Sequence, residues 1–289
     1  MLVVTTRYRV AVLVAACCIC WGTTEARASG HGPLFGAATP VLGKGGFSFD
    51  AALMGRGTDE AIAQSVRSML GFGVTENIQV SVSLPFDIGT HPTLPGGRMM
   101  ASMSSNRDVE LQGAWRVHTR PLGVGGRFET TLIGGWTTPF GGTHHGRPAA
   151  TALSMTAVSG IASRTHYVWL GAAYQRFFEE DDSRPGHVSS YTLVYGYRPP
   201  AWQVEYPKPD VRLFAEVVAE HIGHERLSGL ELSDTGGTAV FVGPSVLALY
   251  KAYALEAGIQ FPLYRNMGAW EPGERFRFGV NFAYFFWMK

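Results

Sequence analysis

Residues 276–286 near the end of the chain read Phe-Arg-Phe-Gly-Val-Asn-Phe-Ala-Tyr-Phe-Phe. Every even-numbered position in this stretch carries an aromatic residue or valine. The odd-numbered positions carry Arg277, Gly279, Asn281 and Ala283 before the pattern ends in aromatics. This period of two is typical of a β-strand that presents one apolar face and one polar or small face. The stretch therefore predicts a strand that separates two different environments.

The same alternation recurs upstream. Residues 78–86 place Ile, Val, Val, Leu and Phe on one face and Gln and Ser on the other. Further clear or weaker segments lie at 44–54, 65–74, 109–117, 128–136, 153–162, 167–177, 187–197, 211–220, 238–250 and 255–261. We predict an all-β chain of about 12 strands, with one helical turn at residues 58–67 in a loop.

The connections between these segments alternate in length. Short ones are expected at 75–77, 118–126, 163–166 and 251–252, and longer polar ones at 87–107, 140–151, 178–186, 221–237 and 265–275. Bacterial outer-membrane barrels alternate in this way, with tight turns at one end and long loops at the other. The connection 198–210 departs from the pattern, because it contains four prolines where a short turn is expected.

Composition separates a membrane barrel from a soluble one. The 289 residues are 46% hydrophobic and only 16% charged, whereas soluble domains carry about 25% charged residues. The polar strand faces hold Ser, Gln, Gly, Thr and scattered charges, whereas the surface of a soluble protein is rich in Lys and Glu. Lys and Arg (24) balance Asp and Glu (23), so charge does not indicate a nucleic-acid partner.

The last strand also fits the assembly signal of outer-membrane barrels, which ends in a spaced glycine and two aromatics. Gly279, Phe282 and Tyr284 occupy those positions. We therefore predict a transmembrane, antiparallel, up-and-down β-barrel in the outer membrane of a Gram-negative cell. Its expected partners are the barrel-assembly machinery and outer-membrane lipid.

The N-terminus has the features of an export signal. Arg7 and Arg9 precede an apolar run at 10–20, and Ala-Arg-Ala at 26–28 supplies a cleavage site. An alternative is lipidation at Cys17, which follows Val-Ala-Ala. All three cysteines lie in this leader, so we expect no disulfide in the exported protein. The predicted organisation is a signal peptide at 1–28, an N-terminal periplasmic segment at 29–43 and the barrel at 44–289.

Three short stretches resemble a known family. They are Leu-Gly-Lys-Gly-Gly-Phe-Ser at 42–48, Gly-Val-Thr-Glu-Asn-Ile at 73–78 and Gln-Phe-Pro-Leu-Tyr at 260–264. They are similar to the MetA-pathway of phenol degradation family, although Ser-Asn-Arg-Asp at 105–108 stands where that family has a Gly-Leu-Gly-Asp-like turn. The resemblance implies a transporter-like outer-membrane barrel for small, hydrophobic or aromatic compounds. It supplies no site residues.

The polar strand faces are expected to line the lumen. On this register the lumen-lining residues are Gln79, Ser81, Glu110, Gln112, Arg116, Glu129, Arg212, Glu216, Glu256, Gln260, Arg277 and Asn281. Charges inside a barrel must pair, because isolated burial is costly. These residues form either a selective polar channel or an ion-pair network that fills the barrel. Their signs are mixed, so we expect no strong ion selectivity.

Histidines and methionines in the expected loops suit soft or borderline metals such as copper. The candidates are His91, Met99, Met100, Met103, His144, His145, His221 and His224. Solvated loop side chains explain the same residues without a metal. We therefore assign no metal and expect no cofactor.

His187 and Ser189 share one face of an expected strand, as the His–Ser pair of outer-membrane lipid hydrolases does. The Asn and Gly that usually follow that serine are absent. We expect no enzymatic activity. The predicted function is passive passage or uptake of a small solute. The alternatives are a lipid hydrolase that uses His187 and Ser189, and a closed structural or metal-binding barrel.

Overall fold

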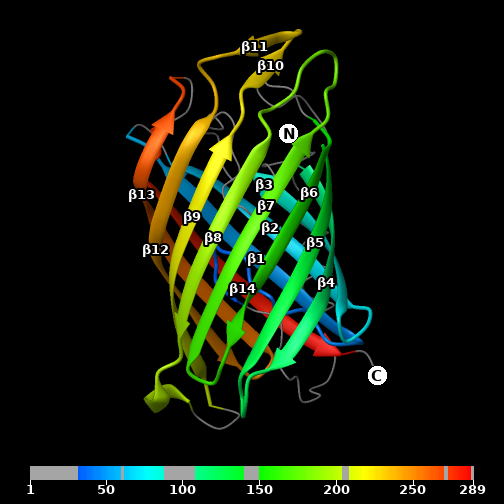
Figure 1. Ribbon diagram of the computed structural model, residues 1–289, viewed down its shortest axis with the longest axis vertical. Helices are drawn as coiled ribbons and strands as arrows, with labels where there is room; N and C mark the ends of the chain where they lie inside the picture. The colour runs from blue at the N-terminus through cyan, green and yellow to red at the C-terminus, as the bar shows by residue number, and fades with distance from the viewer. Residues whose placement is uncertain are drawn as a thin grey trace, which may run out of the picture.

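The computed structural model describes residues 32–59, 62–87, 108–139, 150–203, 208–269 and 273–287. Within these ranges, twelve strands close into a single antiparallel barrel (Figure 1). Its strands are β1 (Gly46–Gly57), β2 (Ile62–Gly73), β3 (Ile78–Asp87), β4 (Asp108–Pro121), β5 (Arg127–Pro139), β6 (Ala152–Ala162), β7 (His166–Phe177), β8 (Val188–Tyr197), β9 (Asp210–Ile222), β12 (Gly237–Tyr250), β13 (Tyr253–Met267) and β14 (Phe276–Trp287).

Each strand of the barrel pairs with its neighbour along the chain, and β14 pairs with β1 to close the wall. The closing register runs from Gly46 opposite Trp287 to Gly57 opposite Phe276. Closure leaves no free sheet edge, which a bilayer would penalise. The predicted all-β, up-and-down, antiparallel barrel of about 12 strands is therefore confirmed.

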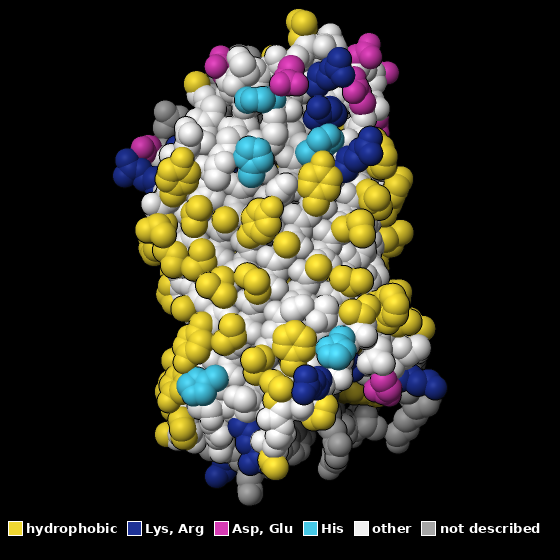
Figure 2. All heavy atoms as spheres, viewed as in Figure 1, with side chains coloured by type: hydrophobic (Ala, Val, Ile, Leu, Met, Phe, Trp, Pro, Cys, Tyr) yellow, Lys and Arg dark blue, Asp and Glu magenta, His cyan; other side chains and the backbone are white. Residues whose placement is uncertain are grey.

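Side chains alternate between the two faces of the wall. In β14, Arg277 and Ala283 are buried in the interior, whereas Val280 and Phe282 are exposed on the outside. The outward side chains of the other strands are likewise large and apolar: Leu53, Leu70, Val80, Leu111, Trp115, Leu132, Trp136, Leu153, Leu170, Leu193, Leu213 and Leu255. Figure 2 shows hydrophobic side chains over the middle of the barrel, with charged and histidine side chains toward its two ends. Such a wall fits a hydrocarbon environment.

In the described part of the chain, no helix is both long enough and apolar enough to span a bilayer.

Three connections differ from the sequence predictions. The helical turn expected at 58–67 is wrong, because β2 already begins at Ile62 and pairs with the end of β1. A small hairpin, β10 (Glu225–Leu227) with β11 (Leu230–Leu232), stands at the end of the barrel drawn uppermost in Figure 1. A 3-10 turn, η1 (Pro200–Trp202), lies in the proline-rich connection at the opposite end.

Residues 32–45, called here the N-terminal segment, lie inside the barrel. The part of the expected periplasmic segment (29–43) that the structure describes includes Phe35 and Leu42, which are buried inside the barrel. Small residues on the inner wall make room for it. A Cβ on Gly258 would lie 2.8 Å from Cε2 of Phe35, and a Cβ on Gly171 would lie 3.1 Å from the Cβ of Ala37. The wall and the segment are thus fitted to each other.

The interior at the end with the short connections contains a large apolar cluster. This buried cluster, called here the apolar base cluster, comprises Leu42, Val158, Tyr167, Trp169, Val194, Phe214, Leu247, Leu249, Ala254, Ala283 and Phe285. These side chains come from seven strands and from the N-terminal segment. The cluster therefore packs the segment against the wall at one end of the lumen.

Candidate functional site

The N-terminal segment is held in the lumen by a buried carboxylate, that of Glu216 on β9. The backbone N–H groups of Leu34, Phe35 and Gly36 donate to its oxygens at 3.0, 2.8 and 2.6 Å. The hydroxyl of Ser245 on β12 donates to the same carboxylate. Successive backbone N–H groups around an anion form a nest, and charge-assisted bonds of this kind are strong. We call this arrangement the Glu216 clamp.

A second set of contacts holds the segment nearer the short connections. The hydroxyl of Thr39 donates to Glu129 at 3.0 Å and accepts the indole N–H of Trp169 at 3.0 Å. The hydroxyl of Thr131 donates to the carbonyl of Thr39 at 2.7 Å. The N–H of Leu42 donates to the side chain of Gln79 at 2.8 Å. Wall residues from several strands thus satisfy the segment's backbone, which a buried chain requires.

Arginines on the wall neutralise Glu129. Nη1 of Arg116 and Nε of Arg127 each lie 3.1 Å from Oε1 of that carboxylate. Arg116 also donates to the carbonyl of Glu76 at 2.6 Å. Both arginines are therefore held by partners near the short connections.

At the end with the long connections, Arg277 is buried between two carboxylates. It donates to Glu220 at 2.9 and 2.7 Å and to Glu274 at 2.6 and 3.1 Å. Its guanidinium also lies 3.6 Å from the centre of the Phe241 ring. We call Arg277, Glu220 and Glu274 the Arg277 network. It joins β14 to β9 across two intervening strands.

Glu274 lies just outside β14 and is buried. Burial alone would raise the pKa of its carboxyl, but the charges of Arg277 and Arg56 outweigh burial and lower that pKa. The group is therefore ionised at neutral pH.

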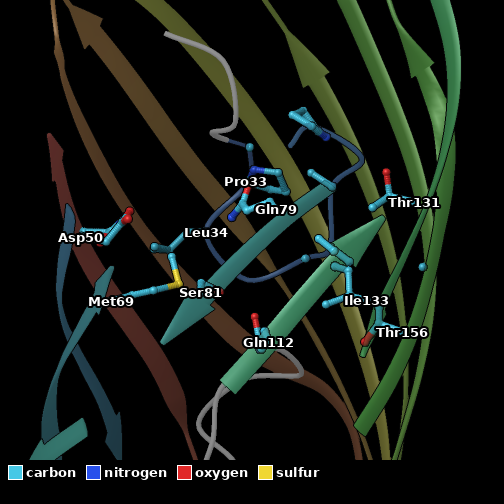
Figure 3. A pocket seen from close by; sticks show the side chains of 18 of the residues that line it. Pro33, Leu34, Asp50, Met69, Gln79, Ser81, Gln112, Thr131, Ile133 and Thr156 are labelled. Carbon is cyan, nitrogen blue, oxygen red and sulfur yellow. The ribbon is translucent and has the colours of Figure 1, made fainter. Parts of the chain in front are cut away.

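A cavity of about 250 Å³ lies beside the N-terminal segment (Figure 3). Its wall includes six of the residues expected to line the lumen: Gln79, Ser81, Glu110, Gln112, Glu256 and Asn281. The amide of Asn281 donates to Asp50 at 3.4 Å and to Glu256 at 3.2 Å, and the amide of Gln112 donates to Glu110 at 2.8 Å. Pro33 and Leu34 of the segment line the same space.

The remaining expected lumen residues have other roles. Glu129 and Glu216 hold the segment, whereas Arg116 and Arg277 are paired. Gln260 is 1% exposed, and Arg212 bonds Asp210 at 2.9 Å near the short connections.

Sequence reasoning missed Asp50, Thr39, Arg67 and Ser190, which line the cavity or hold the segment. Asp50 and Ser190 stand at alternate positions of predicted strands, so period-two alternation could have found them.

The two metal candidates that the structure describes have ordinary partners. Nδ1 of His221 lies 2.9 Å from the hydroxyl of Thr238, and Nδ1 of His224 lies 2.6 Å from the carbonyl of Thr235. Over the described ranges, no group of three His, Cys, Asp or Glu residues could hold a metal. The other candidates lie outside the described residues: His91, Met99, Met100, Met103, His144 and His145.

His187 and Ser189 do not form a hydrolase-like pair. Nδ1 of His187 accepts the backbone N–H of Phe177 at 3.2 Å, and its ring packs edge-on against Tyr174. Ser189 lies on the outer face of β8, opposite His221 of β9. In the described part of the chain, no hydrogen bond joins His187 to Ser189.

Comparisons with known proteins support the fold. No family model and no curated protein matches the chain. Among solved structures, the COG4313 outer membrane channel from Pseudomonas putida F1 is similar, with a TM-score of 0.61 and 15% identity over 85% of this chain and 97% of that one. The NanC porin gives a TM-score of 0.49 and 8% identity over 82% and 98% of the two chains. LpxR from Salmonella typhimurium gives 0.45 and 9% over 83% and 100%.

At these identities the likeness establishes a fold and no more. The closed barrel, its apolar outer wall and this fold together identify an outer-membrane β-barrel. The MetA-pathway family suggested by the sequence is not confirmed.

Proposed function

We propose that this protein is an outer-membrane channel for the passive passage of small solutes, and that its own N-terminal segment closes it. The Glu216 clamp is the observation that carries the proposal. It fixes the segment across the lumen with three backbone hydrogen bonds to one buried carboxylate. Glu216 holds the described tip of the segment, whereas Glu129, Thr131 and Gln79 hold the part nearer β1, so loss of Glu216 would free the tip alone.

The rest of the interior supports passage of something small. The cavity beside the segment holds about 250 Å³ and mixes polar with apolar side chains. Leu34, Met69, Ile133 and Phe285 supply its apolar part, which suits the hydrophobic or aromatic compounds that the sequence resemblance implies. The similar Pseudomonas protein is described as a channel, and we extend that role to this chain.

The proposal includes the steps that bring the chain to the membrane. Residues 1–28 are removed as a signal peptide, and the barrel-assembly machinery recognises Gly279, Phe282 and Tyr284 at the end of the chain. The segment then enters the barrel from the end with the short connections, where it joins β1 at Gly45 and Gly46.

Single-channel conductance of the exported protein and of Glu216→Ala in a planar bilayer tests the proposal. Removing the carboxylate leaves three buried N–H groups without their acceptor, at roughly 1–3 kcal/mol each. We expect the unchanged protein to be mostly closed and Glu216→Ala to show discrete, long-lived openings. Glu179→Ala, which alters an exposed loop carboxylate, is the matched control. Equal conductance in all three proteins would contradict closure by the segment, and silence in all three folded proteins would contradict a channel.

A further inference from the structure

The charges that line the cavity are unbalanced. Three carboxylates, those of Asp50, Glu110 and Glu256, face it together with one guanidinium, that of Arg67. The formal charge of this lining is therefore 1 − 3 = −2. Because the cavity is partly buried, such charges act on a bound solute more strongly than they would in water.

Two other inward arginines of the described residues are paired away from the cavity. Arg116 pairs with Glu129, and Arg277 pairs with Glu220 and Glu274. The mixed signs of the inward strand faces predict weak ion selectivity, but pairing changes this expectation. Among the described residues that line the cavity, an excess of negative charge therefore remains.

Two buried polar groups at the cavity also point to a ligand. Glu110 is 2% exposed, and its Oε2 has no hydrogen-bond partner among the described residues, although Oε1 is bonded to Gln112. Ser190 on β8 lines the same cavity, is 1% exposed, and its hydroxyl also lacks a partner within the described ranges. Buried polar atoms are nearly always bonded, so each one without a partner calls for an explanation.

A negatively charged cavity favours a cationic ligand, and the side chains that line this cavity indicate which kind of cation fits it. The carboxylates do not form a group of three that could hold a metal ion, as judged over the residues described. Apolar side chains share the space, and Figure 3 shows Met69 directed toward Leu34 of the N-terminal segment. A site with a separated carboxylate, a hydroxyl and an apolar wall fits an ammonium group attached to an apolar body.

We propose that the cavity binds a small organic ammonium compound, with Oε2 of Glu110 accepting from the ammonium group and Ser190 supplying a further polar contact. The proposal rests on the proposed function in one respect, since it names the class of solute that the channel takes. A neutral aromatic solute would leave the carboxylate unpaired, and an anionic solute would be repelled by it.

Isothermal titration of the full exported protein in detergent tests this site. The probes are benzylamine, benzyl alcohol and benzoate, which share a ring and differ in charge at neutral pH. We expect binding to rank benzylamine first and benzoate last. A charged hydrogen bond of the usual strength predicts that Glu110→Gln weakens benzylamine binding by about tenfold or more. Ser190→Ala should weaken it by a smaller factor, and Glu179→Gln in the exposed loop should leave it unchanged.

Several results would overturn the proposal: no benzylamine binding, equal binding of the three probes, or unchanged binding in both Glu110→Gln and Glu256→Gln. Heat-modifiable migration on gels shows whether each variant is folded, and the two glutamine variants are independent tests of the acidic lining. Titration needs no open pore, so its outcome is separate from that of the conductance experiment. Openings in Glu216→Ala without benzylamine binding would leave the channel standing and reject only the ammonium site.

Discussion

The two ends of the barrel interior are held together by different kinds of interaction. At the end with the short connections, the apolar base cluster packs around Trp169, which is 1% exposed. At the end with the long connections, the Arg277 network joins strands by ion pairs of 2.6 to 3.1 Å. The first depends on the fit of apolar surfaces and the second on charge, so the two ends should respond differently to mutation and to pH.

This difference indicates which part of the N-terminal segment can move within the lumen. The apolar base cluster loses its packing only when the segment moves away from the wall. The Glu216 clamp is lost as soon as the single carboxylate of Glu216 no longer accepts its hydrogen bonds. The N-terminal segment has both kinds of contact. Its Leu42 belongs to the apolar base cluster, whereas Leu34 to Gly36 depend on Glu216. We therefore expect the tip of the segment to move before its root does.

Trp169→Ala should have the largest effect, because it removes the most voluminous fully buried side chain and the indole bond to Thr39. Tryptophan-to-alanine changes in cores cost about 3–5 kcal/mol. We expect a loss of about 4 kcal/mol in the free energy of unfolding in urea, followed through heat-modifiable migration. A loss under about 1 kcal/mol would mean that the apolar end is loosely packed.

Arg277→Met should cost slightly less, roughly 3 kcal/mol, because it leaves Glu220 and Glu274 buried without their cation. The cost comes from the unpaired charges, so Arg277→Met combined with Glu220→Gln and Glu274→Gln should recover part of it. The same unfolding measurement checks both proteins. If the triple variant is less stable than the single one, the ion pairs are not the source of the cost.

The end with the long connections should respond to acid through Glu274. The pKa of Glu274 is lowered in the folded protein, so its contribution to stability is present at neutral pH and is lost as pH falls through that lowered pKa. Unfolding midpoints measured from neutral to acidic pH should fall less steeply in Glu274→Gln than in the unchanged protein. Parallel curves would show that Glu274 does not contribute to the acid sensitivity.

An exposed ion pair outside both regions should have the smallest effect of these changes on the free energy of unfolding. Arg226 of the β10–β11 hairpin lies 3.3 Å from Glu179, and both side chains are more than a third exposed. Glu179→Ala should change the free energy of unfolding by less than about 1 kcal/mol. A larger loss would mean that the hairpin is more tightly coupled to the barrel than its exposure indicates.

The period-two alternation of the sequence predicted the strands of the barrel wall. It did not predict the N-terminal segment or the ion pairs inside the barrel. The segments at 128–136 and 276–286 repeat with a period of two, and the structure has strands there. The N-terminal segment has no such period, and its main acceptor, Glu216, is 182 residues from Leu34. The charges of the lumen could be placed on an inward face, but their pairing depends on contacts between distant strands. The helical turn expected at 58–67 is wrong for a related reason, because pairing of β2 with β1 from Ile62 onward overrides a weak helical preference.

The most direct test of the account is a reversible lock on the N-terminal segment. A Cβ on Gly36 would press against the side chain of Val194, so Gly36→Cys with Val194→Cys should form a disulfide in a chain whose own cysteines all lie before residue 21. Conductance of one oxidised channel is recorded before and after a reductant is added. The account predicts a fully silent oxidised channel that regains the rare openings of the unchanged protein only after reduction. Openings of equal size and frequency in both states would contradict it.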